Sequence, residues 1–409
     1  MRLLRCGIVA AFLVLAACGS ASSWDPLASV PEPVALPDGM DPRSALAFYA
    51  HGQKLLEGSP SDAAEAFYWA SRLDPVWADP IYARRIALFM SQPYVFRSYL
   101  AGTRRVVTAP GVQRLDSLYL KALALNPFLR RQQDAVALRF VIVDELRQDP
   151  AFRHVTPGDI EFAVDSWLAQ SGPAMRGWLA QSEGRFAEAA RSYEQAIDRR
   201  ETVELLVDLA RVYVHMARFA DARETMGRAL QLLREREADR DELIRLYNSK
   251  ALLEYSMGII FEELDDIDEA RAAYARALQE DLGYHPAHMR LGELALAEGD
   301  TLTALSEMAL AADIRSADAG VSLRYGRVLA QAGQHEDAAA QFRRAAEMEP
   351  SFAEPHLDLA RALEGLGRPD DALAEYRAFT DLASRAHPAL GDASERIRAL
   401  ATNAAGSGS

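Results

Sequence analysis

The histidines are the first residues to test for chemistry, because imidazole serves both as a metal ligand and as a general base. His285 and His288 stand three residues apart, a spacing that places both rings on one side of a helix. No cysteine and no carboxylate cluster accompanies them in the sequence, and a protein metal site needs three or four ligands. We therefore interpret His288 as an ordinary helix residue, and we expect no metal and no cofactor.

The sequence also lacks the patterns that position a nucleophile or a phosphate. His335 and Glu336 begin the helical zinc motif His-Glu-x-x-His, but Ala339 stands where its second histidine belongs. No glycine-rich phosphate loop and no Gly-x-Ser-x-Gly turn occurs. We predict no catalytic residue and a protein that is not an enzyme. The alternative is an enzyme or enzyme subunit whose chemistry lies in the irregular segment 90–165.

Cys18 is the one residue whose surroundings predict a reaction on its own side chain. A basic start over 1–5 precedes an apolar run over 7–17, which is too short to span a bilayer and has the size of a signal-peptide core. The run ends Leu-Ala-Ala-Cys, which resembles the lipobox of bacterial lipoproteins. The resemblance implies that residues 1–17 are removed and that Cys18 carries acyl chains such as palmitate. The alternative is an ordinary secretory signal with a chance cysteine.

The lipoprotein interpretation also predicts a location. With Cys6 removed and Cys18 lipidated, no thiol remains for a disulfide. By the sorting pattern of Gram-negative lipoproteins, Gly19 in place of aspartate implies the periplasmic face of the outer membrane, in a host with two membranes. Residues 18–42 are rich in serine and proline, so we expect an extended tether that holds the folded part several nanometres off the membrane.

The net charge limits the class of partner. The 409-residue chain is 50% hydrophobic and 25% charged, as in folded proteins, and its formal net charge is −14. Such a surface repels nucleic acid and anionic lipid. We therefore expect proteins or peptides as partners and no nucleic acid, with the membrane contacted through the N-terminal lipid.

A repeated spacing organises the second half of the chain. Small residues recur every 34 positions, at Gly258, Gly292, Gly326 and Ala360. Twelve positions after each stands an alanine, and four further on a bulky residue, namely Tyr274, Met308, Phe342 and Tyr376. A fixed period of this length is typical of stacked helix–turn–helix units.

These spacings resemble the tetratricopeptide repeat (TPR). In the unit that matches best, its positions are filled by Tyr325, Gly326, Leu329, Gly333, Ala338, Phe342, Ala345 and Pro350. The resemblance implies an all-α solenoid of helical hairpins that winds into a right-handed superhelix, in which small residues let paired helices approach and aromatic residues fill the gaps. It further implies a concave surface that binds an extended peptide or a partner helix.

The repeat pattern divides the chain. We expect an array over 170–380, with units near 173–202, 203–235, 251–284, 285–318, 319–352 and 353–383 and a charged helical insert over 231–250. A capping helix over 384–402 and a disordered tail over 403–409 follow. Residues 43–165 are expected to be helical with degenerate repeats, with helices over 43–57, 61–73, 79–90, 112–125, 130–147 and 159–170. In the first of these, His51 stands where the repeat pattern expects a small residue.

Arginines flank the small residues of the first helix in several units. The predicted partner-binding groove contains Arg211, Arg290, Glu293, Arg324, Arg327 and Arg361, with Glu262 and Glu364 among them. Guanidinium groups bind carboxylates in a bidentate manner, so this face is suited to acidic groups of a peptide. The alternative is that the arginines pair with the neighbouring glutamates. A TPR clamp for C-terminal carboxylates is not supported, because Met289, Leu323 and Leu357 occupy its positions.

The resulting hypothesis is a non-enzymatic, lipid-anchored scaffold that binds peptide segments or partner proteins through its concave surface, in assembly of an envelope or secretion machine. The alternatives are a structural subunit of a multi-protein envelope complex and an enzyme-associated regulatory subunit.

Overall fold

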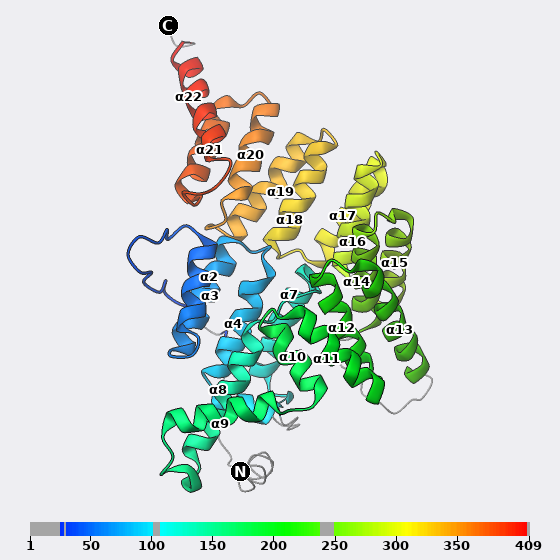
Figure 1. Ribbon diagram of the computed structural model, residues 1–409. Coiled ribbons are helices and arrows are strands. Elements are labelled where there is room, and N and C mark those ends of the chain that lie inside the picture. The colour runs from blue at the N-terminus through cyan, green and yellow to red at the C-terminus, as the bar shows by residue number, and fades with distance from the viewer. Residues whose placement is uncertain (1–24, 28–29, 101–106, 238–248, 407–409) are drawn as a thin grey trace.

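The structure is a computed structural model that describes residues 25–27, 30–100, 107–237 and 249–406. Within these residues every regular element is a helix, as predicted (Figure 1). The N-terminal part consists of α2 (Ala45–Leu55), α3 (Pro60–Leu73), α4 (Ala78–Met90), α5 (Pro93–Leu100), α7 (Pro110–Leu125), α8 (Gln133–Gln148), a 3-10 turn η1 (Pro150–Phe152) and α9 (Pro157–Ala169).

The repeat array follows as six helical hairpins and a final helix. The hairpins are α10 (Pro173–Ser182) with α11 (Phe186–Arg199), α12 (Val203–His215) with α13 (Phe219–Glu237), α14 (Lys250–Glu263) with α15 (Ile267–Glu280), α16 (His285–Ala297) with α17 (Thr301–Ile314), α18 (Ala319–Gln331) with α19 (His335–Met348), and α20 (Glu354–Gly365) with α21 (Pro369–Leu382). The final helix is α22 (Leu390–Gly406). The expected all-α solenoid is therefore confirmed.

Prolines begin helices in the N-terminal part. The predicted helices correspond to α2, α3, α4, α7, α8 and α9, with ends that differ by at most three residues from the prediction. The prediction omits α5, whose first residue is Pro93. A proline at the first helical position loses no hydrogen bond, and its fixed φ suits the helix.

Each hairpin closes through one small residue of its first helix. A Cβ atom added at Gly326 would lie 2.5 Å from the ring of Phe342, sixteen residues later, closer than atoms in contact can approach. The same pairing recurs at Gly177 with Tyr193 and at Gly292 with Met308. The small residue therefore exists to admit the bulky side chain of the second helix, which is buried in every unit.

A second pair of positions varies together among the units. Where the bulky residue is tyrosine, its hydroxyl donates to a polar residue four positions after the small one: Tyr193 to Gln181 at 2.9 Å, Tyr376 to Glu364 at 2.7 Å, and Tyr274 to Glu262. Where the bulky residue is Met226, Met308 or Phe342, that position holds Val214, Leu296 or Ala330. A buried hydroxyl needs a partner, so Glu262 and Glu364 serve the hairpin itself.

This pairing predicts a specific coupling between Glu262 and Tyr274. The variant E262L should cost about 1–3 kcal/mol of unfolding free energy, because it leaves the buried Tyr274 hydroxyl without its acceptor. The double variant E262L/Y274F should cost at least about 1 kcal/mol less than the sum of the single variants, as measured by urea unfolding. The matched control is E262L/Y376F, which joins residues of different hairpins and should be additive. Equal coupling in both pairs would contradict the assignment.

The hairpin of α2 and α3 follows the same rule with one residue fewer. Gly52, and not the position of His51, is the site of close approach, because a Cβ there would lie 2.7 Å from the ring of Phe67. The offset is fifteen residues in place of sixteen, which moves the small residue by one position. The prediction that His51 stands at the close-approach position is therefore wrong, and α2 and α3 form a repeat-like hairpin.

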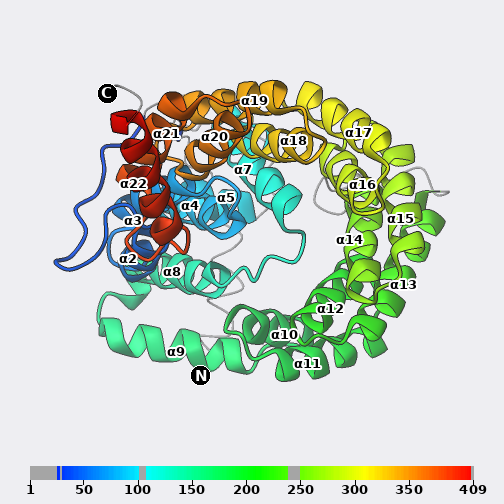
Figure 2. The same cartoon turned by 90° about the horizontal axis from the view of Figure 1, so that it is seen from above.

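The N-terminal part lies between the two ends of the array (Figure 2). On one side, the Arg131 guanidinium lies 3.7 Å from Asp208 of α12. On the other side, the Arg72 guanidinium lies 2.7 Å from Glu349, and Asp41 accepts a hydrogen bond of 2.6 Å from the Arg385 backbone. The array thus curves round the N-terminal helices and is bridged by them.

The contacts between the two parts fall at the beginnings of the first helices. Leu252, near the start of α14, belongs to the same apolar core as α2, α3, α4 and α7, and Tyr284, just before α16, packs against that core. At the start of α18, a Cβ on Gly320 would lie 2.8 Å from Val76. These contacts of the N-terminal part do not involve the second halves of α14, α16 and α18.

Several segments at the predicted boundaries are more ordered than the sequence predicts. Val34 and Leu36 pack against the N-terminal core, and Asp25 pairs with Arg114 of α7, so the described part of the predicted 18–42 tether lies on the fold. The charged insert over 231–250 begins as a continuation of α13 to Glu237, and 238–248 lie outside the described residues. Helix α22 continues through Gly406, so 403–406 are helical where a disordered tail is expected.

Candidate functional site

The predicted groove residues of the last three units lie together on α16, α18 and α20. We call this set, which is Arg290, Glu293, Arg324, Arg327, Asp358 and Arg361, the arginine strip. Each member lies at least four residues after the first residue of the first helix of its hairpin, beyond the helix starts that the N-terminal part contacts. Asp358 is the one member that the sequence prediction omits.

Two carboxylates each bridge arginines along the strip. Glu293 lies 3.2 Å from Arg290 of its own helix and 3.2 Å from Arg324 of the next unit. Asp358 accepts a hydrogen bond of 2.6 Å from Arg327 Nε, and Arg361 lies 3.5 Å away on its other oxygen. The arginines therefore pair with acidic neighbours, as in the alternative interpretation of the sequence, and the four arginines exceed the two carboxylates of the strip by two charges.

The ion pairs of the strip remain open to exchange. Arg327 and Arg361 keep 48% and 55% of their side-chain surface exposed. Exposed pairs of this kind contribute about 0–1 kcal/mol each. A carboxylate of a partner can therefore replace Glu293 or Asp358 as the acceptor at little cost in stability. A row of arginines held at repeat spacing by Glu293 and Asp358 is thus a geometric template for an extended acidic segment.

Arg211 does not belong to that accessible surface. It is 5% exposed, and its guanidinium donates to the Pro127 carbonyl at 3.2 Å and to Asp208 at 2.8 Å. Pro127 lies in the loop between α7 and α8, so the N-terminal part covers this arginine. The prediction of Arg211 as a groove residue is wrong, because Pro127, 84 residues earlier in the chain, accepts from its Nε and the side chain is buried.

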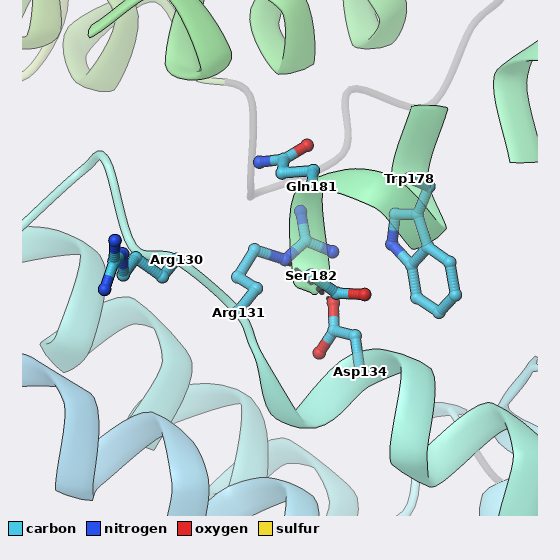
Figure 3. A pocket seen from close by; sticks show the side chains of 6 residues that line it. All are labelled: Arg130, Arg131, Asp134, Trp178, Gln181 and Ser182. Carbon is cyan, nitrogen blue, oxygen red and sulfur yellow. Dashed lines mark hydrogen bonds and ion pairs between the residues drawn. The ribbon is translucent and has the colours of Figure 1, made fainter. Parts of the chain in front are cut away.

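A buried polar cluster joins the N-terminal part to the first hairpin, and the sequence prediction does not include it. Figure 3 shows Arg131 and Asp134 directed toward Gln181 and Ser182 at the end of α10, with Trp178 beside them. Arg131 Nε donates to Asp134 at 3.0 Å, and the buried Tyr82 hydroxyl donates to the same carboxylate. Burial and the Asp134 charge raise the pKa of Tyr82, so Tyr82 stays a donor at neutral pH.

This cluster is structural. The space enclosed by the six side chains of Figure 3 admits no water molecule, so it offers no room for a ligand. Arg131 adopts a φ of 56°, in the left-handed region that costs a non-glycine residue about 1 kcal/mol or more. Its ion pairs with Asp134 and Asp208 hold it there.

Among the histidines that opened the search for chemistry, His288 is hydrogen-bonded within the fold, whereas the buried His335 Nδ1 has no hydrogen-bond partner among the described residues. His288 Nδ1 lies 2.7 Å from Glu307, and its Nε2 lies 3.1 Å from the Leu282 carbonyl. His356 and Glu375 repeat the first of these contacts at 2.7 Å. Among the residues that the structure describes, no group of three or more His, Cys, Asp or Glu side chains could hold a metal ion.

Two carboxylates face each other where the N-terminal part meets α20. Asp74, which ends α3, is largely buried, and burial followed by the Glu354 charge raises its pKa to about 6. The unfolded value is about 3.9. A folded pKa above the unfolded value means that Asp74 stabilises the fold fully below about pH 4 and loses that contribution as the pH rises through 6.

The variant D74N should therefore stabilise the protein at neutral pH and not at pH 4. At pH 7.5 we expect its unfolding free energy to exceed that of the wild type by about 1–2 kcal/mol, with the difference vanishing near pH 4. Comparing the two proteins at each pH removes the opposite contribution of His285, whose pKa burial lowers to about 4. Urea unfolding from pH 4 to 8 measures the difference, and D313N, at an exposed position, is the control. A pH-independent difference would contradict the assignment.

Comparison with known proteins agrees with the geometry of the array. Sequence profiles of the tetratricopeptide repeat family match residues 174–239, 255–320 and 329–383. The chain therefore contains TPR units, and its fold is a TPR-type solenoid. No curated protein matches the chain.

Similar solved structures are TPR proteins that cover about half of the chain. The C-terminal part of a TPR repeat-containing protein from Cytophaga hutchinsonii is 16% identical, with a TM-score of 0.42, covering 50% of this chain and 77% of its own. YrrB, described as a TPR protein with an unusual peptide-binding site, is 19% identical, with a TM-score of 0.37, covering 47% and 93%. MamA is 16% identical, with a TM-score of 0.37, covering 44% and 91%.

Proposed function

We propose that the protein is a non-enzymatic scaffold that binds an extended segment of a partner protein along the arginine strip. The observation that supports this function best is the strip itself: arginines of successive units, spaced by the repeat and bridged by carboxylates, on a part of the array that the N-terminal helices leave uncovered. An extended peptide has its side chains at regular intervals, so such a row can meet several of its acidic groups in turn.

We further propose that the scaffold is anchored by lipid at Cys18 on the periplasmic face of the outer membrane and acts in assembly of an envelope machine. The lipobox-like sequence before Cys18 supports the anchor. Over the described residues, no helix is long and apolar enough to cross a bilayer. Asp25 contacts α7. Six residues separate Asp25 from Cys18, so the seven Cα–Cα steps between them can span at most about 25 Å. The scaffold would then work close to the membrane.

Charge reversal should remove partner binding through the strip. In R324E/R327E/R361E the strip becomes strongly acidic, and we expect the partners that crosslink to the wild type to be lost, as measured by crosslinking and mass spectrometry in cells. The matched control is R185E/R218E/R368E, which reverses exposed arginines that pair with acids three residues later at the starts of second helices. Recovery of the same partners by strip variant and wild type would rule out the strip.

Lipidation should depend on Cys18 alone. Radiolabelled palmitate should enter the wild type and C6A, because Cys6 lies in the segment predicted to be removed. It should not enter C18A, which should leave the membrane fraction. Unchanged membrane fractionation of C18A would refute the anchor.

A further inference from the structure

A second surface of the inner side has a different chemistry from the strip. A cavity of about 270 Å³ lies where the α7–α8 loop meets the second and third hairpins of the array. It is lined by Asn126, Phe128, Val214, His215, Phe219, Ile259, Ile260 and Glu263. Its volume is close to the lower end of the roughly 300–1,000 Å³ of small-ligand sites, which suits one large side chain.

The N-terminal part supplies one wall of this cavity and holds it rigidly. Phe128 is 5% exposed, and its backbone N–H donates to Asn126 Oδ1 at 2.9 Å. The buried Arg211 guanidinium donates to the neighbouring Pro127 carbonyl at 3.2 Å. The wall is therefore formed before any ligand arrives, which lowers the entropic cost of binding.

The lining combines an apolar floor with one negative charge. Val214, Phe219 and Ile259 are only partly covered by the core they pack against. Glu263 is exposed and makes no ion pair with any residue that the structure describes. Burial and the charge of Arg130 lower the pKa of His215 to about 4, so His215 is neutral at pH 7 and Glu263 is the only charged lining residue.

We propose that this cavity takes a large apolar side chain of a bound partner segment and that Glu263 pairs with a lysine or arginine next to it. The charge complementarity specifies the occupant: an apolar group alone would fill the floor, whereas a cation beside that group would also form a charge-assisted hydrogen bond with the carboxylate at the rim. The overall charge of −14 attracts the same kind of partner. This inference rests on the proposed scaffold function and names a sequence class that its partner carries at this point.

The cavity differs from the strip in its position and in the sign of its charge. Glu263 belongs to α14, one unit before Arg290, and its carboxylate is free, whereas Glu293 and Asp358 are occupied by arginines. Its other wall comes from a loop outside the repeats, so the repeat pattern does not create it. A partner that uses both surfaces would carry a basic, apolar end and an acidic end.

Small probes test the cavity without the natural partner. The full chain is prepared with labelled isoleucine methyl groups and titrated with 2-phenylethylamine, 3-phenylpropanoate and benzyl alcohol, which share a ring and differ in charge. We expect saturable shifts of the Ile259 and Ile260 methyl signals with 2-phenylethylamine, at a dissociation constant of about 1–10 mM. Benzyl alcohol should bind more weakly, and the anionic probe should bind weakest of the three.

Two variants separate the charge from the apolar floor. E263Q should weaken 2-phenylethylamine about fivefold and leave benzyl alcohol unchanged, and I259W should abolish both by filling the cavity while keeping the thermal unfolding temperature within a few degrees. E269Q, at an exposed carboxylate of α15, should bind all probes as the wild type does.

The proposal is overturned if no probe shifts these signals saturably, or if the amine and the acid bind equally well. Either result leaves the crosslinking test of the strip unaffected, so failure of the cavity and failure of the scaffold function are distinguishable.

Discussion

The buried charges between the α7–α8 loop and the first units are the constraint on which the rest of the structure depends. Arg131 and Arg211 share Asp208, and the contact between the two parts buries Arg211 and leaves only 23% of the Arg131 side chain exposed. An unpaired buried charge costs several kcal/mol, so neither part can leave the other without exposing or stranding a charge. The strained φ of Arg131 persists for the same reason. The cluster thus fixes the loop, the course of the N-terminal helices and the wall at Phe128.

The parts of the fold that could be predicted from the sequence are those fixed by local spacing. The small and bulky residues of each hairpin lie sixteen positions apart, so the array is visible as a period. The pairing of tyrosines with Gln181, Glu262 and Glu364 could also be predicted from the sequence. The position four residues after the small one is polar where the bulky residue is tyrosine, and apolar where it is methionine or phenylalanine. Gly52 was hidden because one residue fewer lies between the close-approach positions of its hairpin.

The site was harder to predict because exposure at a first-helix position is not a local property. Arg211 and Arg327 have equivalent appearances in the sequence, yet one is buried under Pro127 and the other is half exposed. What decides between them is a loop far away in the chain. The partners of the exposed arginines were local enough to be anticipated as neighbouring acids, but Asp358 was missed, because its role depends on how α18 and α20 stack.

The position of the N-terminal part also determines how a partner can approach. It contacts the starts of α14, α16 and α18 through Leu252, Tyr284 and Gly320, and so competes with any ligand for that level of the inner face. The strip lies further along α16, α18 and α20, and the cavity reaches the end of α14, where Glu263 is the last residue. A partner segment that crosses successive first helices at this level passes from the cavity to the strip, in the order in which the units stack. A bulky domain would have to displace the N-terminal helices, and the buried charges oppose that displacement, so the geometry favours an extended segment over a folded domain as the ligand.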